Sequence, residues 1–200
     1  MMFTGLIEEL GTVARLVSAP GGHELAIRTP LAQGLAAGDS LAVNGVCLTV
    51  AGCEDGAIVT KVGPETARIT NLGRLQAGTV VNLERPVRAD SRMGGHFVLG
   101  HVDGTGRIKE LSSDGEFYWL RVAYPPALRA LIIVKGSVAV DGISLTVARL
   151  SSDDFDVQIV PYTWQHTNLH ARATGDDVNL ECDVLGKYVL RALDARKGEV

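Results

Sequence analysis

The sequence is short of cysteine. Its 200 residues include three, Cys47, Cys53 and Cys182, an odd number without CxxC spacing. This pattern is typical of reduced thiols and argues against a disulfide framework or a zinc site. We therefore expect no metal centre.

Long apolar runs and clusters of positive charge are also missing. No stretch approaches the roughly 20 apolar residues needed to cross a bilayer, and residues 1–5 lack the basic flank and apolar run of a signal peptide. The formal charge is 19 − 23 = −4, without a block of Lys or Arg, so no nucleic-acid surface is expected. These absences predict a cytoplasmic protein that binds small ligands and neither membranes nor nucleic acid.

What is present is an ordinary globular composition. Hydrophobic residues make up 46% of the chain and charged residues 21%, and the mean hydropathy is +0.16. Such a chain has enough apolar residues to fill a core and lies far from the disordered class.

The sequence repeats itself after about half its length. A shift of 97 aligns SLAVNGVCLTVA (residues 40–51) with SVAVDGISLTVA (residues 137–148), and eight of the twelve positions are identical. The same shift aligns TNL at residues 70–72 with residues 167–169, and VNLE at residues 81–84 with residues 178–181, whereas a shift of 95 aligns the start of each half. Solenoid units are shorter, at about 20 to 50 residues, so we infer a duplicated domain with a junction near residues 88–97.

Each half has the pattern of six short strands. Polar and apolar residues alternate in short runs, as at residues 23–29, and turn residues separate the runs. Asn44-Gly45 and Asp141-Gly142 occupy equivalent places and predict tight hairpin turns, because both residue types tolerate positive φ. Six antiparallel strands in under a hundred residues favour a small closed barrel, which has few open edges. Short helical turns are expected after Pro30 and Pro126.

The last segment differs from the rest. Leu185, Val189, Ala192 and Leu193 recur at helical spacing beyond the end of the repeat. The sequence leaves open whether this amphipathic helix packs on its own barrel or on copies of itself in an oligomer.

Polar residues repeated inside apolar strands predict two related binding sites. Unpaired buried hydroxyls cost free energy, so the threonine pairs Thr49/Thr146 and Thr66/Thr163 suggest ligand contacts at a barrel mouth, suited to a planar heterocycle rich in carbonyls and ring nitrogens. For Asn71 and Asn168 a structural role is the better interpretation. The halves differ at other aligned positions: Cys47 corresponds to Ser144, Asn44 to Asp141, Lys61 to Gln158 and Leu6 to His101. Two diverged sites suit a protein that holds two copies of one molecule in different roles.

Individual candidates are weaker. Cys47 is a possible nucleophile, although a strand cysteine is more often a core residue, and Cys53, without a counterpart in the repeat, is interpreted as structural. His101 is placed to transfer protons near neutral pH. His96 and His101 suggest a metal pair, but no third ligand is evident. Gly104-Thr105-Gly106 lacks a following helix, so no dinucleotide cofactor is expected.

Several motifs in order resemble one family. MFTGLIEELG, NGVCLTV, ETARITNLG, MGGHFVLGHVDGTG and DGISLTV are similar to the riboflavin synthases of the alpha-chain type, a family with lumazine-binding repeats, and the resemblance extends from Met2 to about Leu190. It implies an all-β fold of two tandem six-stranded antiparallel Greek-key barrels with a C-terminal helix. The expected division is residues 1–96, residues 97–184, and an oligomerisation helix and tail at residues 185–200.

The resemblance also implies an activity without cofactor or metal. In the family, two molecules of 6,7-dimethyl-8-ribityllumazine exchange a four-carbon unit to give riboflavin and 5-amino-6-ribitylaminouracil. Three chains form a homotrimer, and the active site lies between the N-terminal barrel of one chain and the C-terminal barrel of its neighbour. Association with lumazine synthase is a further expectation. The alternatives are a non-catalytic lumazine or flavin antenna protein and a purely structural duplicated barrel.

Site residues follow from the family by matching position. The first set, assigned to the N-terminal barrel, is Gly5, Leu6, Ile7, Cys47, Leu48, Thr49, Lys61, Val62, Gly63, Pro64, Glu65 and Thr66. The second set, assigned to the C-terminal barrel, is Gly100, His101, Val102, Ser144, Leu145, Thr146, Ile159, Val160, Pro161, Tyr162, Thr163 and Trp164. Lys135 is expected to reach a ligand held by another chain, and Phe3 is expected to matter. The extra Met1 leaves the true start open.

The expected chemistry joins two bound lumazines. One loses a proton from its 7-methyl group, and the other is activated by addition of a nucleophile at ring carbon 7. Holding both molecules in place can replace about 7 to 11 kcal/mol of the barrier. We assign proton transfer to His101, positioning or addition to Ser144 or Cys47, and a supporting role to Asp183, with water or hydroxide as an alternative nucleophile.

Overall fold

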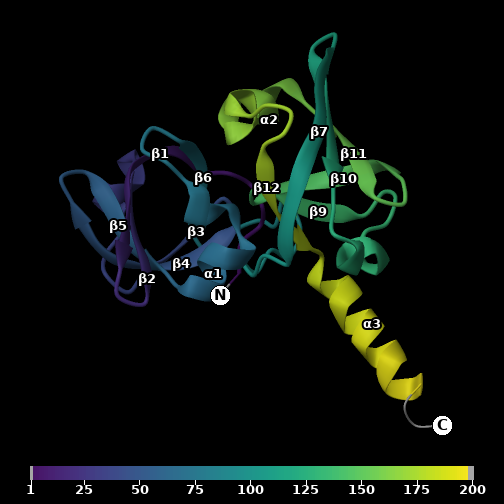
Figure 1. The fold of residues 1–200 in the computed structure, drawn as a ribbon, viewed down its shortest axis with the longest axis horizontal. Coiled ribbons are helices and arrows are strands. Elements are labelled where there is room, and N and C mark those ends of the chain that lie inside the picture. The colour runs from purple at the N-terminus through teal and green to yellow at the C-terminus, as the bar shows by residue number, and fades with distance from the viewer. Residues whose placement is uncertain (1, 198–200) are drawn as a thin grey trace.

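The chain folds into two closed β-barrels followed by a helix (Figure 1). The structure is a computed structural model and describes residues 2–197. The first barrel has the strand order β1-β2-β5-β4-β3-β6. Its strands are β1 (Glu9–Ala19), β2 (Gly22–Arg28), β3 (Ser40–Val43), β4 (Val46–Glu54), β5 (Ala57–Val62) and β6 (Val80–Glu84).

The second barrel repeats the first in order and pairing. Its strands close as β10-β11-β8-β7-β12-β9, which is the same circular order for the equivalent strands. They are β7 (Gly104–Asp114), β8 (Phe117–Ala123), β9 (Ser137–Val140), β10 (Ile143–Leu150), β11 (Asp154–Ile159) and β12 (Asp177–Cys182). All pairs are antiparallel. The expected tandem barrels are therefore confirmed.

Apolar side chains fill the interior of each barrel. In β4, Val46, Leu48 and Val50 are buried while Thr49 between them is exposed. This alternation is the strand period of two, which places successive side chains on opposite faces of the wall. Each barrel has its own apolar core, and the exposed polar side chains of the strands lie on the outer wall.

Short helices connect the strands. The turns expected after Pro30 and Pro126 are the 3-10 helices η1 (Pro30–Gly34) and η3 (Pro126–Leu131). Two further helices, α1 (Pro64–Ile69) and α2 (Pro161–His166), were not predicted; both begin with proline, which is well suited to a first helical position. The 3-10 helices η2 (Asn71–Arg74) and η4 (Asn168–Ala171) follow them.

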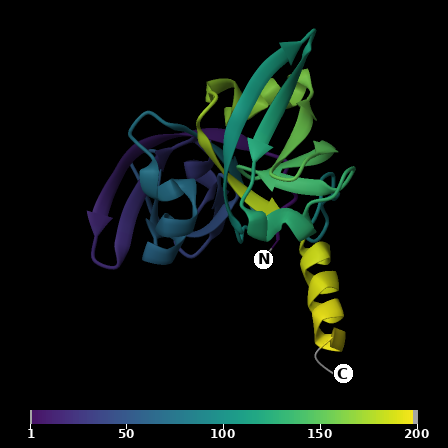
Figure 2. The ribbon, with the colours of Figure 1, turned by 45° about the vertical axis from the view of Figure 1, so that its right-hand side comes forward.

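The C-terminal helix α3 (Val184–Lys197) projects away from both barrels (Figures 1 and 2). The expected helix and tail covered residues 185–200, of which residues 198–200 lie outside the described part. Leu185, Tyr188, Val189 and Leu193 are between 49% and 73% exposed. Packing of this apolar side on its own barrel, one of the two alternatives, is therefore wrong for the single chain. No helix within residues 2–197 combines the length and apolar character needed to cross a membrane.

The two barrels meet back to back at their Asn-Gly and Asp-Gly turns. A Cβ atom on Gly45 would lie 2.8 Å from the Cα of Gly142, and the reverse distance is the same. Asn44 and Asp141 both have positive φ, at 45° and 46°, as expected for these hairpins. Glycine is required here by the contact between the barrels as well as by the turn.

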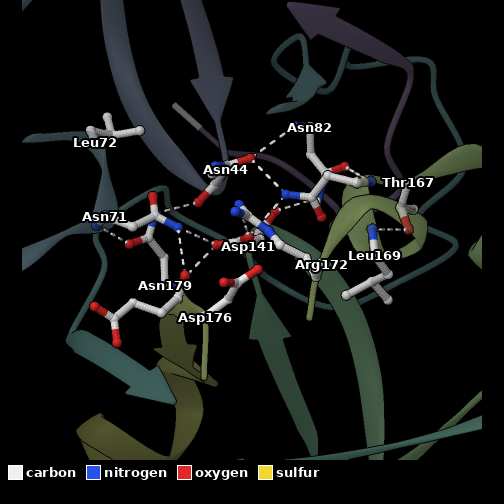
Figure 3. Close-up of polar contacts among 12 residues, drawn as sticks. Asn44, Asn71, Leu72, Asn82, Asp141, Thr167, Leu169, Arg172, Asp176 and Asn179 are labelled. Carbon is white, nitrogen blue, oxygen red and sulfur yellow. Dashed lines mark hydrogen bonds and ion pairs between the residues drawn. The ribbon is translucent and has the colours of Figure 1, made fainter. Parts of the chain in front are cut away.

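A buried amide network closes this junction (Figure 3). The side-chain oxygen of Asn179 accepts the Asn71 backbone N–H at 2.7 Å, and Asn82 accepts the Asn168 N–H at 2.7 Å. The side-chain amides of Asn82 and Asn179 donate to the backbone carbonyls of Asp141 and Asn44. The structural interpretation of Asn71 and Asn168 is confirmed, because their side chains also bond across the junction, Asn71 Nδ2 to Asp141 Oδ1 and Asn168 Oδ1 to Asn82 Nδ2, both at 2.9 Å.

Candidate functional site

Two extended segments cross between the barrels. The first strap (residues 3–7) precedes β1, and the second strap (residues 98–102) precedes β7. They pair as an antiparallel bridge, with Phe3 N donating to Val98 O at 2.7 Å and Val98 N donating to Phe3 O at 3.2 Å. Phe3 is completely buried beside Ala42, Ala139 and the partly buried Cys47, which gives a structural reason for the expectation that Phe3 matters.

Each strap contacts the candidate site residues of the opposite barrel. The carbonyl of Gly5 accepts the Ser144 N–H at 2.8 Å, and the carbonyl of Gly100 accepts the Cys47 N–H at 2.9 Å. Ile7 packs against the core of the second barrel, and Val102 belongs to the core of the first. The sequence-based grouping, which kept residues 5–7 with Cys47 and residues 100–102 with Ser144, is therefore wrong.

We call the two corrected groups the Ser144 site and the Cys47 site. The Ser144 site consists of residues 5–7, 144–146 and 159–164. The Cys47 site consists of residues 100–102, 47–49 and 61–66. Antiparallel pairing places the end of β5 beside the start of β4, and the end of β11 beside the start of β10. The nearest residue pairs are Val50 with Thr60 and Val147 with Val157. The pairing brings together the strand segments that the motifs selected.

Glycine is needed in both straps. Gly5 and Gly100 have φ of 77° and 78°, which ordinary residues rarely adopt. A Cβ atom on Gly5 would lie 2.7 Å from the Ser144 backbone nitrogen, and one on Gly100 would lie 2.8 Å from that of Cys47. The straps approach the strands closely enough to hydrogen-bond because no side chain intervenes.

Ser144 is paired with His96, for which the sequence suggested only a metal pair with His101 that lacked a third ligand. The His96 Nδ1 atom lies 2.7 Å from Ser144 Oγ. His96 is 7% exposed, and its Nε2 has no hydrogen-bond partner within residues 2–197. Burial lowers the pKa of His96, while the carboxylate of Asp183 opposes this change. Its only sequence signal was a histidine in the motif MGGHFVLG, because Ser144 is far away along the chain.

The second barrel adds aromatic side chains to the Ser144 site. Trp164 stacks on Tyr118 with ring centroids 3.8 Å apart, and Tyr162 is 71% exposed and stacks on His166. All four tyrosines and both tryptophans lie beyond residue 116. The two sites therefore differ in their aromatic surface as well as in their reactive groups.

The Cys47 site has a half-buried thiol surrounded by exposed polar groups. Burial raises the pKa of Cys47, which a hydrogen bond with Ser40 partly offsets. Thr49, Lys61 and His101 are exposed. A raised pKa keeps the thiol protonated near neutral pH, so this geometry favours Cys47 as a hydrogen-bonding group over a thiolate nucleophile.

Two threonines of the candidate sites point outward from the barrel walls. Thr49 and Thr146 are exposed, whereas their neighbours Leu48 and Leu145 are buried. Strand alternation turns the Thr49 and Thr146 hydroxyls outward, whereas Thr66 and Thr163 are half-buried, and ligand contact by these four threonines stays a prediction. Cys53 is exposed, and its thiol donates to the Leu35 carbonyl at 3.4 Å.

Lys135 occupies a left-handed turn. Its φ is 67°, and the glycine at the equivalent position of the first barrel, Gly38, has a φ of 95°. Lys135 is exposed. A non-glycine residue in this region costs roughly 1–2 kcal/mol, so a lysine at this position lowers stability.

Comparisons with known proteins match the whole architecture. A family model described as "Lumazine binding domain" matches residues 4–86 and again residues 99–183. The riboflavin synthase of Actinobacillus pleuropneumoniae is 43% identical over 189 residues, covering 94% of this chain and 88% of the relative. That of Bacillus subtilis is 40% identical over 195 residues, covering 96% and 90%.

A solved structure has the same fold. The crystal structure of LumP complexed with 6,7-dimethyl-8-(1'-D-ribityl) lumazine superposes with a TM-score of 0.83 and covers 90% of this chain and 99% of LumP, at 21% sequence identity. At that identity the likeness concerns the fold.

Proposed function

The chain belongs to the riboflavin synthase family, and from that premise we propose that its Ser144 and Cys47 sites each hold one substrate molecule. The reaction converts two molecules of 6,7-dimethyl-8-ribityllumazine into riboflavin and 5-amino-6-ribitylaminouracil by transfer of a four-carbon unit. One observation carries the assignment of the sites: a duplicated barrel presents two equivalent but chemically unequal surfaces, each completed by a strap.

The unequal side chains support unequal roles for the two bound molecules. Ser144 Oγ, hydrogen-bonded to the neutral ring of His96, is suited to orient or assist a nucleophile at carbon 7 of one lumazine. His101 is exposed at the Cys47 site and is suited to move the proton of the 7-methyl group of the other. Cys47 positions a ligand through its thiol, and Asp183, near His96, is the supporting carboxylate. Water or hydroxide remains the alternative nucleophile.

Two bound molecules react only if the sites face each other. We propose a homotrimer in which the exposed apolar side of α3 packs on its copies, so that the Cys47 site of one chain faces the Ser144 site of the next. Lys135 then reaches a ligand held by another chain. Orientation of the two reactants can supply about 7 to 11 kcal/mol of the barrier reduction.

Cytoplasmic residence and association with lumazine synthase also belong to the proposal. Cell fractionation and co-purification test these two points.

Incubation of the purified protein with 6,7-dimethyl-8-ribityllumazine tests the activity directly. We expect flavin absorbance to grow, with one riboflavin formed for every two lumazines consumed. Binding without flavin formation would instead identify a non-catalytic antenna protein.

Three variants test the assigned roles. His101→Ala, Ser144→Ala and Cys47→Ser are each expected to lower kcat, by about a hundredfold where a proton-transfer group is lost. Wild-type rates in all three would overturn the residue roles while leaving the activity in place.

A further inference from the structure

Two buried carboxylates occupy equivalent places on the last strands of the barrels. Glu84 in β6 is 6% exposed and Glu181 in β12 is 3% exposed, and the repeat aligns them. Neither lies within ion-pair distance of a cationic side chain among residues 2–196. Burying a carboxylate is costly unless other donors replace water, so the partners of these two groups explain why they are retained.

Backbone N–H groups of the straps are those partners. Glu84 Oε1 accepts from the Thr4 backbone nitrogen and from Thr4 Oγ1, both at 2.7 Å, and Glu84 Oε2 accepts from Gly5 N at 3.0 Å. Glu181 accepts from Leu99 N at 2.7 Å and from Gly100 N at 3.0 Å. Each carboxylate thus accepts hydrogen bonds from two successive backbone N–H groups of one strap.

These hydrogen bonds reach the first residue of the opposite site. Gly5 donates its N–H to Glu84 in the first barrel and accepts the Ser144 N–H of the second barrel through its carbonyl. Gly100 does the same between Glu181 and Cys47. A single glycine therefore links each carboxylate to the strand that carries the reactive group of the other barrel.

We propose that Glu84 and Glu181 are positioning residues with crossed targets: Glu84 sets the geometry of the Ser144 site in the second barrel, and Glu181 that of the Cys47 site in the first. The inference rests on the proposed function, because it takes these two sites as the substrate sites. A carboxylate is needed because its two oxygens accept from two N–H donors. A glutamine has only one acceptor oxygen, and its NH2 group would face one of the backbone N–H groups.

The repeat supplies a matched pair of variants, Glu84→Gln and Glu181→Gln, with the same chemical change at equivalent positions. Riboflavin bound at the Cys47 site should protect Cys47 from an alkylating reagent, so the degree of protection reports occupancy of this site. The assay uses a Cys53→Ser background at about pH 8.5, near the ordinary thiol pKa. Cys182 stays silent because burial raises its pKa to about 12.

We expect both variants to lose about tenfold or more in kcat/KM, because the reaction needs both sites and small misplacements are costly. The riboflavin concentration for half-protection of Cys47 should rise about tenfold in Glu181→Gln and stay within about twofold of wild type in Glu84→Gln. A purely structural role would not produce this split. If either glutamine variant fails to fold, Glu84→Asp and Glu181→Asp replace the pair. Aspartate keeps both oxygens but holds them farther from the strap, so these variants should show the same difference in Cys47 protection.

Three outcomes would overturn the crossed assignment. They are equal changes in protection in the two glutamine variants, full activity in both variants, and no protection of Cys47 in the wild-type protein. A wild-type protein that protects Cys47 but forms no riboflavin would refute the catalytic function and leave the crossed assignment to be decided by the protection split.

Discussion

His96 and Ser144 show how a functional contact arises between single residues distant in sequence. Their hydrogen bond joins the linker between the barrels to β10. Burial lowers the pKa of His96, so the ring is neutral near pH 7 and one of its nitrogens can accept a proton. Protonation would place a second N–H in a buried space where Nε2 has no partner within the described chain.

This arrangement predicts a pH dependence. The unfolded histidine has a pKa of about 6.5, above the value in the folded protein, so the unfolded chain binds more protons between the two values. Stability therefore falls as pH falls through this window. We expect wild type to lose more unfolding free energy than His96→Asn, which does not titrate, when denaturation is measured from about pH 7.5 down to about pH 5.5. Equal losses in the two proteins would contradict the prediction.

Lys135 gives a second prediction at the scale of one residue. Lys135→Gly removes the strain of a left-handed lysine, of roughly 1–2 kcal/mol, and adds backbone entropy to the unfolded state, of about 0.5–1 kcal/mol. We expect unchanged or slightly raised thermal stability together with lower activity. In the control Gly38→Lys, made at the equivalent turn, stability should fall and activity should remain. Full activity of Lys135→Gly would show that the lysine does not reach a ligand.

At the scale of the element, α3 stands apart from the repeat. The ion pair between Lys187 and Asp103, at 2.6 Å, anchors its first turns, while the apolar residues farther along face solvent in the single chain. Isolated helices of this length are marginally stable in water. Contacts with other copies would bury the apolar side and stabilise the helix.

We expect Val189→Lys to raise the dissociation constant of the trimer by roughly a thousandfold or more, since each of the three copies loses about 1.5 kcal/mol or more of apolar burial. Sedimentation equilibrium measures the change. The control Arg191→Gln, on an exposed polar position of the same helix, should sediment like wild type. A wild-type protein that sediments as a monomer would remove the proposed assembly.

At the scale of the whole molecule, the junction between the barrels is nearly symmetric. Asp141 breaks the symmetry: its Oδ2 accepts from Arg172 at 2.7 Å, and both side chains are largely buried. In the first barrel the equivalent positions are Asn44 and Leu75. Asn44 Nδ2 is buried without a hydrogen-bond partner in the described part of the chain.

The difference predicts a double-mutant cycle. Arg172→Leu should destabilise the protein by about 3 kcal/mol in chemical denaturation, because it leaves a buried carboxylate without its cation. The combination Asp141→Asn with Arg172→Leu gives the second barrel the residues that the first barrel has at these positions. It should recover most of the lost stability. Additive effects of the two changes would show that the ion pair is not coupled.

Much of the fold could be predicted because its signals are local. The alternation of polar and apolar residues located the strands, and Asn44-Gly45 and Asp141-Gly142 located two hairpins. The helices α1 and α2 were missed because six residues are too few to show helical periodicity. The division of the chain at residues 96 and 184 stays a prediction.

The site was predictable in its members but not in its grouping. The motifs selected the segments around Gly5, Cys47, Gly100 and Ser144, but His96 was assigned no part beside Ser144. Its partner lies 48 residues away, and no spacing rule connects them. The roles of these residues stay predictions.

The sequence by itself determined two similar barrels, their turns, and the segments that carry polar groups, because each depends on neighbours along the chain. Only the tertiary structure decided which barrel each strap completes. Because the domain is duplicated, the strands that the two straps contact are almost identical in local sequence. Which strap contacts which strand therefore depends on contacts between distant residues: the hydrogen bonds of the straps to Glu84 and Glu181, and the bridge between Phe3 and Val98. These contacts join residues about 80 or more positions apart in the chain, so no local sequence pattern reveals them.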